Sequence, residues 1–274
     1  MPSLEANRLV KAFADLRAAG RKTVIPFITA GYPDLGATAA LLGEFARRGV
    51  RVCELGIPFS DPVADGPVIQ SSYTHALDSG VTSEAIFQMV RRFRQAGGAG
   101  QLALVAMVSY SIVFRRGVAR YFADARDAGF DGLIIPDLPL EEAGDAESAA
   151  REAGLCNVML IAPTTSPARR LEIARHSRGF VYYISIAGIT GARDRLPADT
   201  IAAVSELRKG TDTPVCVGFG ISNAATVEEV CKVADGAIVG SAIVKRIMEE
   251  KDKPAAQMLA EVGDFVGKLL TPLQ

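Results

Sequence analysis

The chain has 274 residues, of which 49% are hydrophobic and 22% are charged, so it has enough apolar material for a large core and too little charge for a disordered protein. Its 30 basic and 31 acidic residues give a net charge of -1, which leaves no excess of positive charge for binding nucleic acid or anionic lipid. Any anionic ligand must therefore be held by a local site.

The four cysteines are far apart and form no C-x-x-C pair, which predicts small buried thiols in a reducing compartment. The first 20 residues carry charged side chains among the apolar ones, so they lack the uncharged core of a signal peptide. No stretch elsewhere is long and apolar enough to cross a membrane. We therefore expect a cytoplasmic protein.

Short apolar runs alternate with segments of helical spacing along the whole chain. Continuous apolar runs are typical of strands buried on both faces, and their alternation with helices implies parallel crossover units. Leu9, Phe13 and Leu16 predict an extra helix before the first strand, and further helix faces begin at Ile86 and Met258. The eight predicted strands are Thr23–Ile28, Arg51–Ile57, Leu102–Val108, Gly132–Ile135, Asn157–Ala162, Phe180–Ile184, Pro214–Val217 and Gly236–Val239.

Eight such units close most naturally into a barrel. We therefore predict the α/β class and a (β/α)8 TIM barrel with an extra N-terminal helix, as a single domain over residues 1–274. An open doubly wound sheet uses the same units and is the alternative, although no G-x-G-x-x-G follows the first predicted strand.

The second predicted strand contains the most unusual residue of the sequence, Glu54. A carboxylate within an apolar strand is costly to bury unless it is paired or takes part in chemistry. Active sites of these barrels lie at the C-terminal ends of the strands, and burial would raise the pKa of a glutamate above about 4.3 and suit it to proton transfer. The alternative is a structural glutamate that is paired with an arginine or capped by backbone donors.

The loop after this strand is rich in proline and carries two aspartates, Asp61 and Asp65. Its apolar and rigid composition indicates more than a surface connection. Each aspartate has a simpler interpretation as a turn residue, because Asp-Pro and Asp-Gly both favour turns.

Glycine-bearing turns follow the seventh and eighth predicted strands, at residues 218–222 and at Gly240-Ser241. In these barrels the loops at these two positions form the usual phosphate cradle, together with helix N-termini. Although glycine is also the ordinary residue of tight turns, the pair of turns predicts a phosphorylated substrate. A third glycine-rich segment, residues 187–193, predicts further donors or a mobile lid.

Several kinds of chemistry are disfavoured. His75 and His176 stand away from the predicted strand ends, which argues against a metal site with histidine ligands. Lysine is absent from the same ends, since Lys22 lies at the opposite end of the first strand, so Schiff-base chemistry lacks its nucleophile. We therefore expect acid-base catalysis by carboxylates, with no metal and no other cofactor.

The segment 54–67, ELGIPFSDPVADGP, resembles the signature of tryptophan synthase alpha subunits. The resemblance extends over nearly the whole chain and includes residues 26–33, 136–139, 162–165, 188–193, 218–222 and 240–241. It implies a lyase of tryptophan biosynthesis that cleaves indole-3-glycerol phosphate to indole and glyceraldehyde 3-phosphate by a retro-aldol reaction, with the indolenine of the substrate as the electron sink.

The resemblance also implies roles for particular residues. Glu54 would transfer the protons, and Asp65 would accept a hydrogen bond from the indole N–H and stabilise its developing positive charge. Tyr182 would lie near the catalytic glutamate, although from the sequence alone it is equally an aromatic core residue. The substrate-binding positions would be Gly191, Gly220, Gly240 and Ser241 for the phosphate, Phe27 for the indole pocket and Thr190 for the closing loop.

The chain departs from the family pattern at Ser109, Ser111 and Ile186. The family commonly has two adjacent tyrosines, then Asn and Pro, where this chain has Ser109-Tyr110-Ser111-Ile112, so an indole-pocket contact and a partner-facing loop are both altered. Ile186 occupies a position that is arginine in some members.

The resemblance implies a beta-subunit partner in an alpha2beta2 tetramer. One alternative is a stand-alone lyase that releases free indole. Two others are a different phosphate-binding barrel, such as a phosphoribosyl isomerase, and a catalytically idle homologue that activates a partner synthase.

Overall fold

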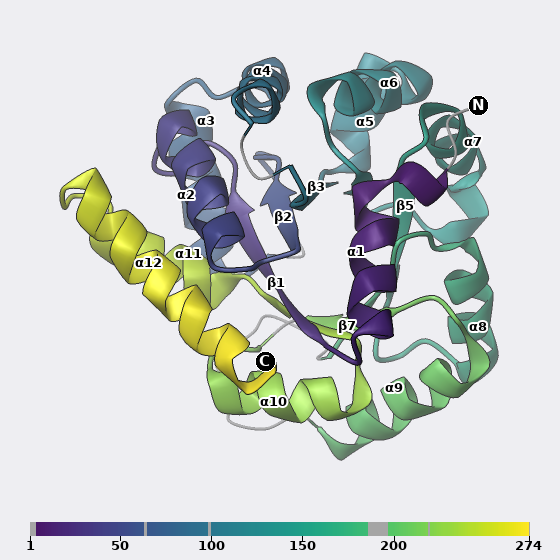
Figure 1. Cartoon of the computed structure of the whole chain (residues 1–274). Coiled ribbons are helices and arrows are strands. Elements are labelled where there is room, and N and C mark those ends of the chain that lie inside the picture. Colours follow the sequence, from purple (N-terminus) through teal and green to yellow (C-terminus); the bar gives the residue numbers. More distant parts are fainter. Residues whose placement is uncertain (1–3, 63–64, 98–99, 186–196, 219, 274) are drawn as a thin grey trace.

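The computed structural model describes residues 4–62, 65–97, 100–185, 197–218 and 220–273. Eight parallel strands close into a barrel in the order β1 to β8, with helices around it (Figure 1). The strands are β1 (Thr23–Thr29), β2 (Val52–Gly56), β3 (Ala103–Met107), β4 (Gly132–Ile134), β5 (Cys156–Ile161), β6 (Val181–Ile184), β7 (Val215–Gly218) and β8 (Gly236–Val239). The predicted (β/α)8 barrel is confirmed, and the open-sheet alternative is wrong because β1 pairs with both β2 and β8.

The helices follow the strands in the expected alternation, and two of them lie in each of the connections after β2, β3 and β8. Several begin at a capping side chain: Asp34, Thr82 and Asn223 each accept a hydrogen bond from the backbone N–H three residues ahead. The helices are α1 (Arg8–Ala18), α2 (Leu35–Arg47), α3 (Pro67–Asp78), α4 (Ser83–Gln95), α5 (Tyr110–Arg116), α6 (Val118–Ala128), α7 (Gly144–Ala153), α8 (Pro167–His176), α9 (Ala198–Gly210), α10 (Ala224–Val233), α11 (Ser241–Glu250) and α12 (Ala255–Leu270), with 3-10 turns η1 (Leu4–Ala6), η2 (Leu140–Glu142) and η3 (Thr271–Leu273).

Strand side chains alternate between two cores. In β2, Val52 packs inside the barrel, whereas Cys53 and Leu55 pack between the barrel and the surrounding helices. The same alternation directs Glu54 into the barrel. All four cysteines are buried and unbonded, as predicted.

Helix α1 closes the N-terminal end of the barrel. Leu9, Phe13 and Leu16 pack on the side chains inside the barrel, which confirms the extra N-terminal helix. The Asn7 side chain, which caps α1, also donates hydrogen bonds to the carbonyls of Asp131 and Gly154, at 2.8 and 3.0 Å. Because this end is filled, the opposite, C-terminal end of the strands is left for a site.

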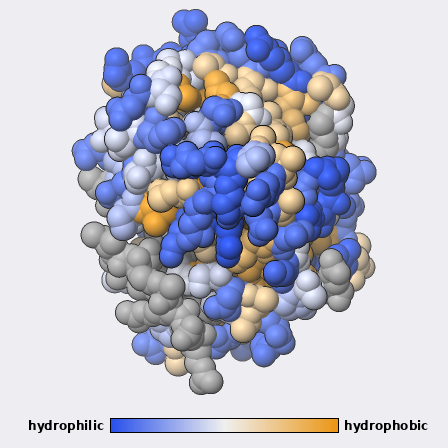
Figure 2. All heavy atoms as spheres, turned by 90° about the vertical axis from the view of Figure 1, so that its left-hand side faces the viewer, coloured by the Kyte–Doolittle hydropathy of each residue, from blue (hydrophilic) through white to orange (hydrophobic). Residues whose placement is uncertain are grey.

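The surface on the side of α12 and α2 is mostly hydrophilic, with smaller apolar areas between the polar residues (Figure 2). The inner face of α12 buries Met258, Val262 and Val266. Among the described helices, none has both the length and the apolar composition that are needed to cross a membrane.

Candidate active site

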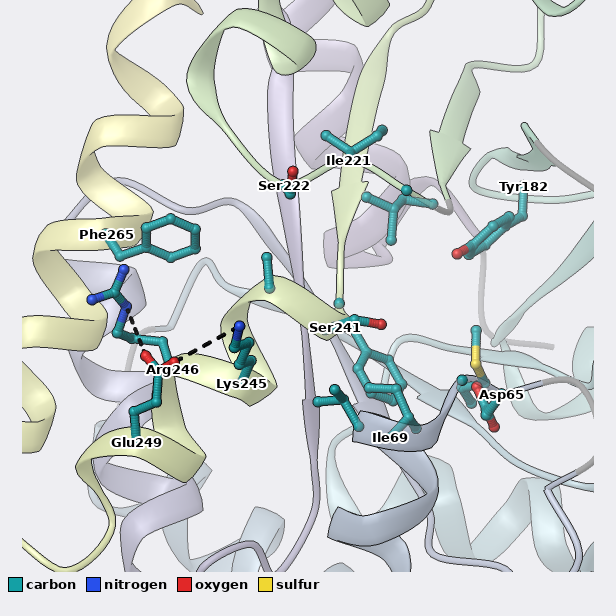
Figure 3. A pocket seen from close by; sticks show the side chains of 18 residues that line it. Asp65, Ile69, Tyr182, Ile221, Ser222, Ser241, Lys245, Arg246, Glu249 and Phe265 are labelled. Atoms are coloured by element: carbon teal, nitrogen blue, oxygen red, sulfur yellow. Dashed lines mark ion pairs between the residues drawn. The ribbon is translucent and has the colours of Figure 1, made fainter. Parts of the chain in front are cut away.

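A cavity of about 440 Å³ opens at the C-terminal ends of the strands (Figure 3). Six of the nine site residues predicted from the sequence line it, although they come from distant parts of the chain. The lining residues are Phe27, Asp65, Gly66, Val68, Ile69, Met107, Tyr182, Gly220, Ile221, Ser222, Ile238, Gly240, Ser241, Ala242, Lys245, Arg246, Glu249 and Phe265.

Glu54 lies behind the wall of this cavity rather than on its surface. The strand register places it beside Phe27 of β1 and Val105 of β3, and its side chain is completely buried. Neither carboxylate oxygen has a hydrogen-bond partner among the described residues. The paired or capped structural glutamate considered above therefore has no support in the described part of the chain.

This burial determines the protonation state of Glu54. Removing a carboxylate from water without a partner costs several kcal/mol, so the group favours its neutral form. Burial raises the pKa of Glu54 well above its usual value. The raised pKa favours the protonated carboxylic acid, which is the form that a general acid needs.

Asp65 is the second carboxylate of the site and lines the cavity directly. Its backbone is fixed within the loop before α3, because its N–H donates to the Pro62 carbonyl at 3.0 Å and its own carbonyl accepts from the Gln70 side chain at 2.8 Å. Burial raises the pKa of Asp65 to about 6, which still leaves it mostly ionised at neutral pH. The pKa values of the two carboxyl groups therefore differ, with that of Glu54 raised well above its usual range and that of Asp65 raised to about 6.

Two tyrosines accompany these carboxylates, Tyr182 from β6 and Tyr73 from α3. Burial raises the pKa of both phenols, and the carboxylates of Asp65 and Glu54, when ionised, raise it further. Glycines at strand ends make room for them: a Cβ at Gly218 would lie 2.3 Å from the Tyr182 hydroxyl, and one at Gly56 would lie 2.6 Å from the Tyr73 hydroxyl. Both rings are therefore held in place as uncharged hydrogen-bonding groups.

The glycine turns after β7 and β8 meet on the same cavity. Gly240 caps α11, whose first turn contains Ser241, and Gly220 adopts a left-handed conformation with φ of 80°. Backbone N–H groups in the first turn of a helix have no acceptor within the helix, and they carry the positive end of its dipole. The arrangement can therefore bind an anion such as phosphate. Thr190 and Gly191, with the segment 187–193, lie outside the described residues.

Several cavity residues come from helices and were not predicted from the sequence, among them Ile69, Lys245 and Phe265. Lys245 lies one helical turn after Ser241, and Glu249 approaches both Lys245 and Arg246 to 4.0 Å (Figure 3). Only the four-residue spacing from Ser241 could have indicated Lys245. Its side chain is 66% exposed, unlike the desolvated amine of a Schiff-base enzyme.

The histidines lie away from this cavity. The His75 ring in α3 packs edge-on against Tyr32, and His176 at the end of α8 contacts Glu147 at 2.8 Å. Within the described ranges, no three His, Cys, Asp or Glu side chains gather closely enough to hold a metal ion. The expected absence of a metal and of any cofactor stays a prediction.

Comparison with known proteins shows the family to which the chain belongs. The sequence model of the family described as "Tryptophan synthase alpha chain" matches residues 13–270. The tryptophan synthase alpha chain of Rhodopirellula baltica is 41% identical over 268 residues, which cover 95% of this chain and 96% of the relative. That of Geobacter sulfurreducens is 43% identical over 263 residues, or 96% and 97% of the two chains.

Solved structures agree with this relationship. The alpha subunit of tryptophan synthase from Legionella pneumophila superimposes with a TM-score of 0.88 at 32% identity, covering 97% of this chain and 98% of that one. A chain of Mycobacterium tuberculosis tryptophan synthase gives a TM-score of 0.87 at 34% identity, with 98% of each chain covered. The closed barrel, the cavity at its C-terminal end and these similarities agree, and the chain belongs to the tryptophan synthase alpha chain family, the lyases that serve as alpha subunits in tryptophan biosynthesis.

Proposed function

We propose that this protein cleaves indole-3-glycerol phosphate to indole and glyceraldehyde 3-phosphate by acid-base retro-aldol chemistry. The observation that carries the proposal is the buried and unpartnered carboxyl group of Glu54, which lies behind a cavity lined by Asp65. The same cavity ends in an anion cradle, as a phosphorylated substrate requires.

Glu54 acts first as a general acid. Its proton adds to C3 of the indole ring and gives a cationic indolenine, while the ionised Asp65 accepts a hydrogen bond from the ring N–H and stabilises the positive charge. Because Glu54 lies behind the cavity wall, its side chain must turn toward the bound substrate to reach C3.

The second step returns the proton. The Glu54 carboxylate takes the proton from the hydroxyl on the carbon attached to C3, and the O–H electron pair forms the new carbonyl group. The carbon–carbon bond breaks, and its electron pair restores the aromatic indole. Glu54 is left protonated for the next cycle, so no redox partner or external acid is needed.

The remaining predicted residues position the substrate. Gly220, Gly240 and Ser241 bind the phosphate through backbone N–H groups and the serine hydroxyl. Phe27 packs on the indole ring, and Tyr182, whose hydroxyl fits over Gly218, orients the reacting groups beside Glu54. Thr190 and Gly191 keep their predicted roles in the closing loop and the phosphate site.

We further propose that a tryptophan synthase beta subunit is the partner, in an alpha2beta2 assembly, as the family implies. A stand-alone lyase stays the alternative, because Ser109, Ser111 and Ile186 depart from the family pattern. A cytoplasmic location and a single domain over residues 1–274 stay predictions from the sequence.

The test is the release of indole from indole-3-glycerol phosphate by the purified chain, measured alone and with a beta subunit added. Glu54→Gln should lower turnover by at least a thousandfold, since it removes the transferable proton, while affinity for glycerol 3-phosphate stays within about threefold. Glu249→Gln is the matched control, because this glutamate lines the same cavity and its carboxylate lies near the charges of Lys245 and Arg246.

The outcomes separate the alternatives. Indole released rapidly without a partner would indicate a stand-alone lyase, and release only with the beta subunit would indicate a paired synthase subunit. No release in either case, with retained phosphate affinity, would favour an isomerase-type substrate or an idle homologue. Turnover retained by Glu54→Gln would refute the role of this residue.

A further inference from the structure

A second, smaller cavity of about 140 Å³ adjoins the active-site cavity. Asp65 and Met107 line both, so the two spaces share a wall. The rest of the smaller cavity is mainly apolar, with side chains such as Ile57, Val108 and Leu160. It therefore offers space for apolar atoms next to the reaction site.

Ser109 keeps one side of this smaller cavity open. It stands two residues after the end of β3, caps α5 and lines the cavity. Its hydroxyl donates to Asp137 Oδ2 at 2.7 Å, and the next backbone N–H, that of Tyr110, donates to Asp137 Oδ1 at 2.8 Å. The Tyr110 ring packs toward Phe114 instead, with ring centroids 5.9 Å apart. The turn therefore contributes only a small side chain to the cavity wall.

The orientation of the substrate under the proposed function directs its benzo ring toward this space. The phosphate is held at Ser241 and the ring N–H at Asp65, while the glycerol chain leaves from C3. Carbons 5 and 6 of the indole are the ring atoms far from C3, so they lie on the side away from the phosphate. Asp65 belongs to the shared wall, so this edge of the ring faces the smaller cavity.

We propose that Ser109 is a specificity-determining residue, which lets the enzyme cleave indole-3-glycerol phosphates with a small uncharged substituent on carbon 5 or 6. This inference rests on the proposed cleavage reaction. A methyl group or a chlorine atom is no larger than a water molecule, whose share of liquid volume is about 30 Å³, so the cavity of about 140 Å³ accommodates it.

The charged residues that line the smaller cavity limit which ring substituents it can accept. The carboxylates of Asp61, Asp65 and Asp137 line the smaller cavity, and no lysine or arginine is among its described lining residues. A carboxylate on the ring would be repelled there and would lose its water. Neutral substituents are therefore accepted and anionic ones of similar size are rejected.

The experiment measures kcat/KM for indole-3-glycerol phosphate and for its 6-chloro, 6-methyl and 6-carboxy derivatives, with the full-length protein. The readout is the ratio of each derivative to the parent compound, which cancels changes common to all substrates. In the wild type, the two neutral derivatives should stay within about threefold of the parent. The carboxylate should be at least tenfold poorer.

Variants test whether Ser109 sets this preference. Ser109 and Leu160 both line the cavity, so Ser109→Tyr and Leu160→Phe each fill part of it. Each should lower the ratio for the 6-chloro compound by about 10- to 200-fold, the range for one misfitting group in a pocket. Ser109→Ala removes the hydrogen bond to Asp137 without filling space and should keep the wild-type ratio. Ser111→Tyr, at an exposed position of α5 that does not line the cavity, is the matched control.

The results of these measurements would support or overturn the proposed role of Ser109. If the wild type cleaves the parent compound but discriminates more than tenfold against both neutral derivatives, the inference is wrong and the proposed function stands. If Ser109→Ala changes the ratio as much as Ser109→Tyr, size at this position is not the cause. If no compound is cleaved, either by the chain alone or with a beta subunit added, both the inference and the proposed function fail.

Discussion

Glu54 and Asp65 are both acidic residues of one site, but their surroundings give them different protonation states. Glu54 is enclosed in the barrel without a hydrogen-bond partner among the described residues, and burial raises its pKa well above the usual range. Asp65 is less enclosed and has a pKa of about 6. Near neutral pH these surroundings favour the protonated form of Glu54 and the ionised form of Asp65, as the proposed cleavage requires.

This difference predicts a pH profile. The value of kcat/KM for cleavage should rise with pH through about 6, as Asp65 ionises, and below that pH it should fall about tenfold per unit. The Asp65→Asn variant should have a low kcat/KM, and this value should not rise with pH through about 6. An unchanged rise in Asp65→Asn would assign the titration to another group.

The same pKa affects stability. Because the folded state binds the Asp65 proton more tightly than the unfolded state, whose pKa is near 3.8, the free energy of unfolding should fall as pH rises from about 4 to 6 and stay lower above that. Asp65→Asn should remove this loss, worth at most about 3 kcal/mol, so thermal unfolding should show a stabilised variant at pH 8 and little difference at pH 4.

A substitution at Gly218 tests whether the position of Tyr182 matters for cleavage. Alanine would place a Cβ 2.3 Å from the Tyr182 hydroxyl, so the tyrosine must move. We expect Gly218→Ala to lower kcat/KM at least tenfold, as measured by indole release. Gly43→Ala in α2, where a Cβ would meet nothing within 4 Å, should leave activity unchanged and stabilise the helix by up to about 1 kcal/mol. Equal activity of both variants would contradict a positioning role for Tyr182.

The sequence predicted some of these residues better than others. A carboxylate in an apolar run is visible without coordinates, so Glu54 could be singled out, and the glycine turns after two strands indicated the cradle. Tyr73, Ile69 and Lys245 belong to helices whose spacing fits an ordinary amphipathic helix. These residues reach the site because α3 and α11 begin beside the C-terminal end of the barrel. The local sequence does not determine this placement.

At the scale of the elements, every strand begins and ends within one residue of its predicted bounds. Strands that are buried on both faces appear in the sequence as continuous apolar runs, so their first and last residues are easy to identify. The short α5 was not predicted, since its seven residues are too few for a clear period. Its start depends on the side chain of Asp137, which accepts from Ser109 and Tyr110.

Two aspartates before β4 and β8 anchor neighbouring strands in the same way. Asp131 accepts from the N–H of Leu104 in β3, and Asp235 accepts from the N–H of Val215 in β7. Their cationic partners differ in burial: Arg94 beside Asp131 is 12% exposed, whereas Lys22 beside Asp235 is 28% exposed. Both anchors lie at the N-terminal ends of strands, away from the cavity, where residues serve stability.

Replacing these anchors should therefore separate stability from catalysis. Asp131→Asn leaves Arg94, which is only 12% exposed, without its carboxylate and should lower the free energy of unfolding by about 3–5 kcal/mol, while Asp235→Asn should lose less. Urea unfolding measures both, and kcat of the folded variants should match the wild type. A larger loss for Asp235→Asn would contradict this ranking.

At the scale of the whole molecule, the two ends of the barrel differ: α1 fills one end, and the cavity opens at the other. Phe114 of α5 is 67% exposed and is the one large hydrophobic side chain with such exposure among the described residues. It lies shortly after β3, on the side of the strand ends where the cavity opens. An exposed aromatic of this kind is a typical anchor of a protein interface.

We therefore predict that Phe114→Asp weakens binding of a tryptophan synthase beta subunit by tenfold or more, as measured by calorimetry and by stimulation of cleavage. Cleavage by the isolated chain should not change. Gln257→Asp on α12, in another part of the molecule, is the control with the same added charge. If the Phe114 variant binds like this control, the beta subunit docks elsewhere.

The position of α1 also has a consequence for synthesis in the cell. The helix leaves the ribosome before the strands of the barrel, but its partners Asp131 and Gly154 follow 124 and 147 residues after Asn7. Contacts between such distant residues form late, so the apolar face with Leu9, Phe13 and Leu16 stays uncovered while half of the protein is translated. A nascent chain of this protein should therefore need a chaperone at α1 at least until Phe180, whose ring packs against that of Phe13, has emerged.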